Sequence, residues 1–206
     1  MKDSYNEYLE YEQKMQREGL FEVISQKFEI KKAIYPGSYI HISPSFYFEE
    51  VVYIDSDKKA KKFFADNSFE KLINHKKRYS KEICFRFYPT NFKNILPEEE
   101  AYFDLLISQY AGFISRECKK YLKIGGILLV NNSHGDAQLA KHDPDYEFIA
   151  VINFRNKKFY YSTKNLDEYF IPKKEGLKID LEYFLSINKG IGFKKSASHY
   201  VFRKIR

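Results

Sequence analysis

Two short apolar runs, each ending in a polar turn, constrain the fold of this 206-residue chain more than any other feature. The first run ends in Tyr35 and the turn Pro36-Gly37-Ser38, and the second, residues 51–54, ends in Asp55. A proline favours an extended conformation in the residue before it, as a strand end requires. In a nucleotide-binding α/β fold, the turn after the first strand faces the ligand, and the acid ending the next strand holds ribose hydroxyls. This pair of segments therefore predicts an α/β sheet with a ligand site at one edge.

The rest of the chain alternates strand-like and helix-like segments, which predicts an α/β sheet covered on both faces by helices. The sheet is expected to be mostly parallel, with an antiparallel C-terminal hairpin at its edge. Helices are expected at residues 3–28, 58–65, 113–122, 136–141 and 181–185. Asp57 is expected to cap the helix at 58–65, and Gly125-Gly126 are expected to end the helix at 113–122. Strands are expected at 33–35, 50–55, 82–88, 103–108 and 127–130, with a hairpin of 147–153 and 158–162 and a final edge strand at 200–204.

Length and composition indicate one soluble domain. The chain is 44% hydrophobic and 31% charged, and no apolar run approaches the ~20 residues that span a bilayer. The N-terminus lacks an apolar signal-peptide centre, so we expect a cytoplasmic protein. A single domain over 1–206 would comprise an N-terminal helix (1–28), a core (30–153) and C-terminal hairpin and edge elements (154–206). Cys84 and Cys118 form no Cys-x-x-Cys pair, which argues against structural zinc, and Cys84 is expected in the core.

The net charge of +7 makes an acidic partner such as nucleic acid a possible one. Only 7 of the 35 basic residues are Arg, and the Lys pairs are scattered along the sequence. Proteins that read phosphates and bases specifically rely on Arg, so a solvated surface is the simpler interpretation. Nothing in the sequence indicates a membrane partner.

The order of these segments resembles the class I S-adenosylmethionine-dependent methyltransferase fold, a Rossmann-like family, over residues 30–153. The segment Leu122-Lys123-Ile124-Gly125-Gly126 is similar to the family's "L-x-x-G-G" approach to its fifth strand. The glycine loop is degenerate, because Tyr39 and His41 stand where small residues would continue it. The resemblance implies an S-adenosylmethionine site, with Asp55 on the ribose. It assigns seven residues to the cofactor: Tyr35, Pro36, Gly37, Ser38, Asp55, Ser56 and Ser108.

A polar cluster follows the most apolar strand, at residues 131–136. Dense donors, acceptors and a titratable histidine at a strand end are typical of a functional loop. His134 would act as a general base, Asp136 would orient it or bind substrate, and Tyr110 would face the acceptor. The substrate-binding residues are expected to be Asn131, Asn132 and Ser133. The alternative is a plain turn in which Asp136 caps a helix.

Three functions remain open from the sequence. The first is an S-adenosylmethionine-dependent methyltransferase with an unknown acceptor. The second is a non-catalytic binding module of the same fold, with Tyr39 and His41 filling the cofactor site and a basic surface facing nucleic acid or protein. The third is a metal-assisted hydrolase using His134, Asp136 and His142, although the histidine spacings match no tight metal motif and no metal is expected.

Overall fold

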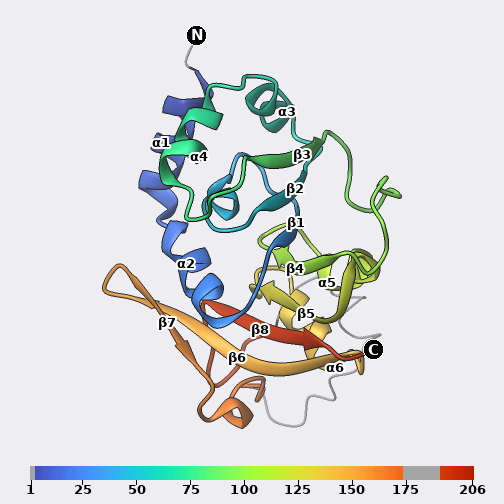
Figure 1. The fold of residues 1–206 in the computed structure, drawn as a ribbon. Helices are drawn as coiled ribbons and strands as arrows, with labels where there is room; N and C mark the ends of the chain where they lie inside the picture. Colours follow the sequence, from blue (N-terminus) through green and yellow to red (C-terminus); the bar gives the residue numbers. More distant parts are fainter. Residues whose placement is uncertain (1–2, 174–190) are drawn as a thin grey trace. The chain divides into compact units, whose positions relative to one another are not determined.

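The computed structural model describes residues 3–173 and 191–206. The chain divides into two compact units, Met1–Pro97 and Glu98–Arg206 (Figure 1). That the two units form one domain stays a prediction. The helix expected at 181–185 lies outside the described residues.

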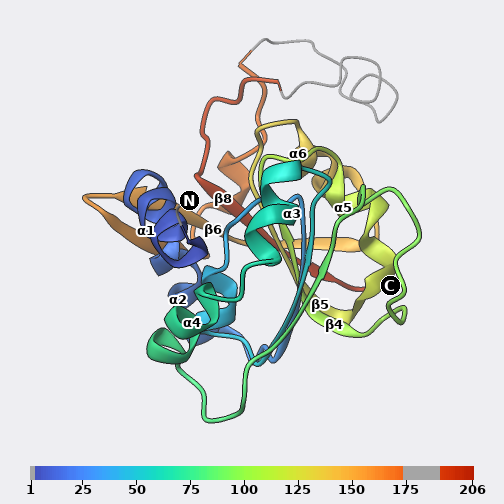
Figure 2. The same ribbon diagram turned by 90° about the horizontal axis from the view of Figure 1, so that it is seen from above.

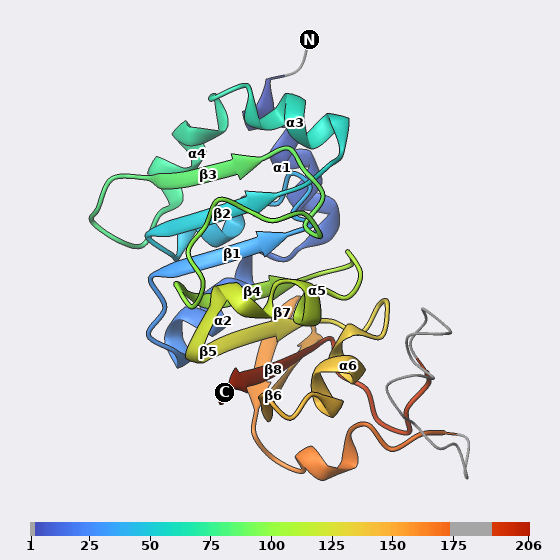
Figure 3. The same ribbon diagram turned by 90° about the vertical axis from the view of Figure 1, so that its right-hand side faces the viewer.

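Over its described residues, 3–97, the first unit contains three parallel strands, as predicted. They are β1 (Lys32–Pro36), β2 (Glu50–Ile54) and β3 (Cys84–Tyr88), with β2 in the middle. Figure 3 shows the three arrows pointing the same way. The residues that end these strands therefore meet at one edge, where ligands bind in open α/β sheets. Cys84 is exposed, so the expectation that it lies in the core was wrong; it stands at the start of an edge strand.

The leading helix is two helices, α1 (Ser4–Met15) and α2 (Glu18–Lys27), rather than one. Gln16 takes the left-handed conformation, with a φ of 51°, and its N–H closes the last turn of α1 on the carbonyl of Glu12. The Glu12 carboxylate then accepts the N–H of Glu18 at 2.6 Å, which satisfies a free donor at the start of α2. A side-chain contact across the break therefore stabilises this bend, although no Gly or Pro stands between the two helices to indicate it in the sequence.

Two further helices and a 3₁₀ turn complete the first unit: α3 (Lys58–Phe64), α4 (Phe69–Lys76) and η1 (Ser43–Phe46). Asp57 caps α3 by accepting the N–H of Lys59 at 2.6 Å, as predicted. No sequence pattern predicted α4, which packs against α1 (Figure 1). The Ser4 hydroxyl joins these helices, because it donates to the carbonyl of Asp66 at 2.7 Å and accepts the N–H of Phe69.

Aromatic rings fill the core of the first unit, which accounts for many of the 19 Phe and 18 Tyr. Phe63 stacks on Phe69 with ring centroids 5.1 Å apart, and Phe64 stacks on Phe87 at 4.2 Å. Such ring pairs stabilise a core beyond the area that they bury. The aromatic residues here are therefore packing residues.

The described part of the second unit contains five strands: β4 (Phe103–Ser108), β5 (Leu122–Val130), β6 (Tyr146–Arg155), β7 (Lys158–Ser162) and β8 (His199–Lys204). Their order is β4-β5-β8-β6-β7. β4 and β5 are parallel, and all other pairs are antiparallel. The predicted hairpin of β6 and β7 is confirmed. The prediction that the last strand lies at an edge was wrong, because β8 pairs with β5 on one side and β6 on the other, and its first four residues are buried.

The segment before the fifth strand was also predicted wrongly. Instead of a helix over 113–122 there are a single turn, α5 (Ile114–Glu117), and a 3₁₀ turn, η2 (Lys119–Tyr121). β5 already begins at Leu122, so Gly125 and Gly126 lie inside the strand and end no helix. Gly125 has a φ of +81° at an irregularity in the pairing of β4 with β5, which is the usual place for glycine in a strand. The helix predicted at 136–141 is confirmed as α6 (Asp136–His142), which packs against α5 (Figure 2).

Together these elements confirm a mixed α/β fold with parallel strands in both units and an antiparallel hairpin at one edge. Within the described residues, no helix is both long and apolar enough to cross a membrane.

Candidate functional site

The turn after β1 folds over the end of β2 and brings two of the predicted features together. The N–H groups of Gly37 and Ser38 donate to the carbonyl of Ile54 at 2.7 and 3.3 Å. The N–H of Tyr39 donates to Oδ2 of Asp55 at 2.7 Å. Gly37 has a φ of 67°, which glycine adopts without steric cost. The first turn and the acid of the second strand are therefore direct neighbours within the first unit.

Asp55 keeps part of its capacity to accept hydrogen bonds. Oδ1 accepts the N–H of Asp57 at 2.8 Å, and Oδ2 accepts the N–H of Tyr39. A carboxylate offers about four lone-pair sites, so one site on each oxygen remains for a hydroxyl. Its side chain is half-buried, whereas the neighbouring Ser56 is exposed.

His41 does not line this turn. It is fully buried, and its Nδ1 lies 3.0 Å from the Tyr35 hydroxyl while its Nε2 lies 2.6 Å from the Ser43 hydroxyl. Burial raises the pKa of Tyr35 well above its ordinary value. Both rings therefore belong to the core, and Tyr35 faces the turn only with its backbone. This geometry does not support the prediction that the His41 side chain fills the cofactor site.

Tyr39 stays at the turn. It has a φ of +49°, which is uncommon for a residue with a side chain. Its ring lies 5.9 Å from that of Tyr11, and Nζ of Lys59 lies 5.8 Å from the ring centroid. Ser38 is buried, and its hydroxyl donates to the Tyr39 carbonyl at 3.4 Å. Tyr39 is thus the bulky residue beside Asp55.

In the second unit, Asp136 joins three elements. Its carboxylate accepts the hydroxyls of Ser108, at the end of β4, and Ser115, in α5, each at 2.5 Å, and also the N–H of Ser115. The side chain is buried. Burial raises its pKa to about 6, although the hydrogen bonds from the two serines act in the opposite direction. Ser108, predicted to touch the cofactor, uses its hydroxyl on this carboxylate.

His134 and Tyr110 lie at the exposed side of the same loops. Nε2 of His134 lies 3.3 Å from the carbonyl of Tyr110, and Tyr110 is 56% exposed with a φ of 58°. The structure describes no hydrogen bond between His134 and Asp136, both of which lie in its described part. The predicted pair of a base and its orienting carboxylate is therefore not in contact, although the charge of His134 lowers the pKa of Asp136.

Asn131 organises the loop after β5. Its Oδ1 accepts the hydroxyl and N–H of Ser133, at 3.0 and 3.3 Å, and lies 3.4 Å from the N–H of Tyr110. Its Nδ2 is buried without a partner, and so is Oδ1 of the neighbouring Asn132. Buried polar atoms are normally hydrogen-bonded, so a bound group or water is expected to complete this set.

Sequence reasoning missed two buried residues beside this loop, Gln109 and His199. Nε2 of His199 lies 3.2 Å from Oε1 of Gln109, and Nε2 of Gln109 is a further buried atom without a partner. Gln109 directly follows β4, which is a signal that could have found it. His199 could not have been found while β8 was taken for an edge strand, because only its antiparallel pairing with β5 brings its first residue to the carboxyl end of β5.

A metal site finds no support in the part of the chain that the structure describes, where no three His, Cys, Asp or Glu residues gather closely enough to hold an ion. His142 is exposed at the end of α6, away from any such group. The residues of the hydrolase alternative are therefore not assembled around an ion.

Several solved structures are similar to this chain in fold. They include the YcgJ protein from Bacillus subtilis, with 18% sequence identity and a TM-score of 0.41, and a methyltransferase from Geobacter sulfurreducens, with 11% and 0.48. A tRNA methyltransferase, TrmI, from Aquifex aeolicus has 14% sequence identity and a TM-score of 0.45. The alignment with YcgJ covers 59% of this chain and 54% of YcgJ, so the chain spans about half the length of YcgJ. The alignment with the Geobacter methyltransferase covers 66% of this chain and 73% of the other, and that with TrmI covers 90% and 68%. No protein-family model matches the sequence, and no curated protein does.

Proposed function

We propose that the first unit binds a nucleoside, S-adenosylmethionine, and that the protein is a methyltransferase. The observation that carries this proposal is the 2.7 Å hydrogen bond between the N–H of Tyr39 and the carboxylate of Asp55. It fixes the acid of the second strand beside the first turn, at the sheet edge where ribose is bound in nucleotide-binding α/β proteins.

The residues present fit the ribose. The two remaining acceptor sites of Asp55, one on each oxygen, suit the two neighbouring hydroxyls of a ribose ring. Gly37, without a side chain, lets the ligand approach the backbone closely. S-adenosylmethionine, when bound, supplies an activated methyl group, and the protein's contribution is to position the acceptor and receive its proton.

We also propose that the loops of the second unit serve the acceptor. His134 is the exposed titratable side chain there, and it would take the proton. Asp136, which contacts Ser108 and Ser115 instead of His134, is a positioning residue. The buried unpartnered amide atoms of Asn131 and Asn132 would bind the substrate's polar groups. Replacement of His134 by Gln should shift the pH profile of methyl transfer, whereas the same change at exposed His142 should not.

Calorimetry with S-adenosylmethionine tests the cofactor proposal. We expect Asp55→Asn to abolish the heat of binding, because an amide nitrogen cannot accept the hydrogen bond that a ribose hydroxyl donates. The control is Asp57→Asn, two residues on, which keeps a good helix cap for α3 and should bind like the wild type. A ligand at about 100 times its Kd should also stabilise the folded protein by about 2.7 kcal/mol.

The second candidate, a non-catalytic module, rests on Tyr39, whose ring lies at the turn and whose N–H uses one site of Asp55. Tyr39→Gly separates the two candidates, since glycine keeps the positive φ and removes the ring. Binding by both proteins supports the enzyme, and binding by Tyr39→Gly alone supports the module. If neither protein binds at millimolar ligand, the nucleoside site itself is refuted.

A further inference from the structure

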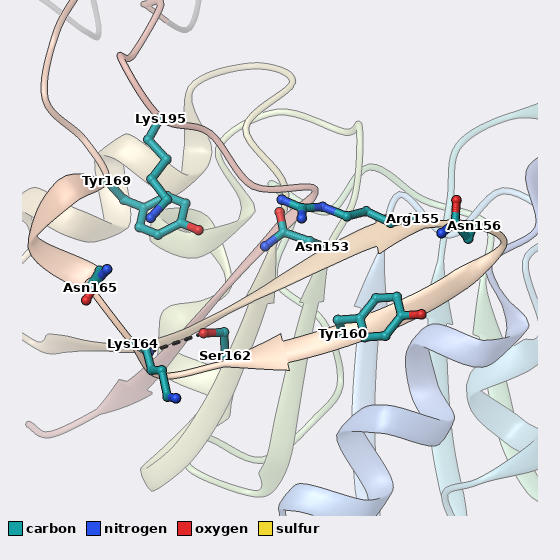
Figure 4. Close-up of a pocket in the computed structure, with 9 residues that line it drawn as sticks. All are labelled: Asn153, Arg155, Asn156, Tyr160, Ser162, Lys164, Asn165, Tyr169 and Lys195. Atoms are coloured by element: carbon teal, nitrogen blue, oxygen red, sulfur yellow. Dashed lines mark hydrogen bonds between the residues drawn. The ribbon is translucent and has the colours of Figure 1, made fainter.

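A polar groove lies on one face of the β6–β7 hairpin, within the second unit, and shares no residue with the candidate functional site. Its volume is about 490 Å³, within the range of about 300–1,000 Å³ that holds small ligands. Figure 4 shows its lining side chains. They are Asn153, Arg155, Asn156, Tyr160, Ser162, Lys164, Asn165, Tyr169 and Lys195.

The register of the hairpin builds the floor of this groove. Asn153 pairs with Tyr160, and Arg155 pairs with Lys158. Because side chains alternate between the faces of a strand, these residues share one face, and Phe154 and Phe159 share the other. The two phenylalanine rings pack together with centroids 4.7 Å apart. One face of the hairpin therefore carries the aromatic pair, while the other contributes polar side chains to the groove.

The far wall comes from two segments that are distant in sequence. A β-bridge between Pro172 and Phe193 joins them and holds Lys195 beside Tyr169. Nζ of Lys195 lies 4.6 Å from the centroid of the Tyr169 ring and forms an ion pair with Glu168. The wall thus offers an aromatic ring and a lysine that is partly neutralised by Glu168.

The charges and the exposure of the lining side chains indicate which kind of ligand this groove would bind. Three of the nine lining residues are cationic, and none is acidic. Within the described residues, neither Arg155 nor Lys164 forms an ion pair. Tyr160 is 49% exposed, which is unusual for a large ring and leaves its face open. Unpaired cations beside an open aromatic ring are the combination that binds single-stranded nucleic acid, where phosphates meet the cations and a base stacks on the ring.

We propose that this hairpin groove binds a segment of single-stranded nucleic acid. Arg155 and Lys164 contact phosphates, and Tyr160 stacks on a base. The amides of Asn153 and Asn165 offer hydrogen bonds to base edges. The proposal does not depend on a nucleoside cofactor, so the failure of either leaves the other standing.

The test is fluorescence anisotropy of the full chain with labelled single-stranded RNA and DNA of about 12 nucleotides, a typical site size. Affinity is measured over a series of salt concentrations. Removal of both cations, in R155A/K164A, should weaken binding and flatten the slope of log K against log salt by about 1.4, that is, ~0.7 for each lost phosphate contact. The matched control is K71A/K93A, which removes two exposed lysines of the first unit and should leave the slope unchanged.

The ring is tested separately. Tyr160→Ala should weaken binding by about 5- to 150-fold, and Tyr160→Phe, which keeps the stacking face, should bind nearly like the wild type. Thermal unfolding of each variant checks that it is folded, which is expected because these side chains are exposed. Poly-L-glutamate at equal charge serves as a competitor.

Three results would overturn the proposal. The first is the absence of oligonucleotide binding at low salt. The second is an equal loss of slope in the control pair, which would mean that charge acts without a site. The third is unchanged affinity in Tyr160→Ala together with full competition by poly-L-glutamate, which would point to an acidic protein partner.

Discussion

The buried carboxyl group of Asp136 makes the stability of the second unit depend on pH in an unusual direction. In the folded protein its pKa is raised from 3.8 to about 6, because burial disfavours the charged form. The folded state therefore holds its proton more tightly than the unfolded chain does. Stability from this group is fully present below about pH 4 and is lost as the pH rises through about 6.

The size of the effect follows from the same shift. A rise of about 2.2 pKa units at about 1.36 kcal/mol each gives about 3 kcal/mol of unfolding free energy. Asp136→Asn removes the titration and keeps the shape, since the amide oxygen can accept from Ser115 and the amide nitrogen can donate to the Ser108 hydroxyl. We expect the stability of the wild type, relative to the variant, to fall by about 3 kcal/mol between about pH 3 and pH 7.

Urea denaturation of both proteins at several pH values measures this difference, and the comparison cancels all other titrating groups. Asp143→Asn is a useful contrast, because Asp143 lies in the same unit but is paired with Lys119 at 2.7 Å. A difference that is flat, or that rises with pH, would refute the reasoning. It would mean that the donors from Ser108 and Ser115 outweigh burial and keep Asp136 ionised.

Two further predictions concern glycines and thiols. Gly126→Ala should destabilise the protein by about 1–3 kcal/mol, because the new Cβ would lie 2.6 Å from Cδ1 of Leu122. Gly125→Ala meets open space and should cost only its strained φ of +81°, about 1–2 kcal/mol. Chemical denaturation of both variants checks this account, and an unchanged stability of Gly126→Ala would contradict it. In a thiol-reagent assay, exposed Cys84 should react at once in the folded protein. Cys118, whose pKa burial raises to about 12, should react only after denaturant is added, and fast labelling of both would show that it is not buried.

Local sequence signals located most strands well. The apolar run at residues 103–108 is β4 with the same bounds, and the turn Arg155-Asn156-Lys157 joins the predicted hairpin. Asp57 caps α3 as expected, because capping depends on a side chain and an N–H two residues away. Such features rest on short-range geometry, which the sequence carries directly.

Features that depend on distant partners were missed. The break between α1 and α2 depends on the carboxylate of Glu12, and α4 depends on its packing against α1. The glycines of β5 suggested a helix end, but the pairing of β5 with β4 extends the strand through them. Propensity is a weak guide when tertiary contacts favour another conformation.

The candidate site likewise combines features that local sequence signals predict with features that depend on distant partners. By itself, the sequence determined that Gly37 and Asp55 follow two consecutive strands, because apolar runs and turn residues mark strand ends locally. Only the tertiary structure decided that the N–H of Tyr39 contacts Asp55, that His41 lies in the core, and that Asp136 contacts Ser108 and Ser115 instead of His134. The direction of a side chain is set by the elements that pack around it, and those neighbours come from distant parts of the chain.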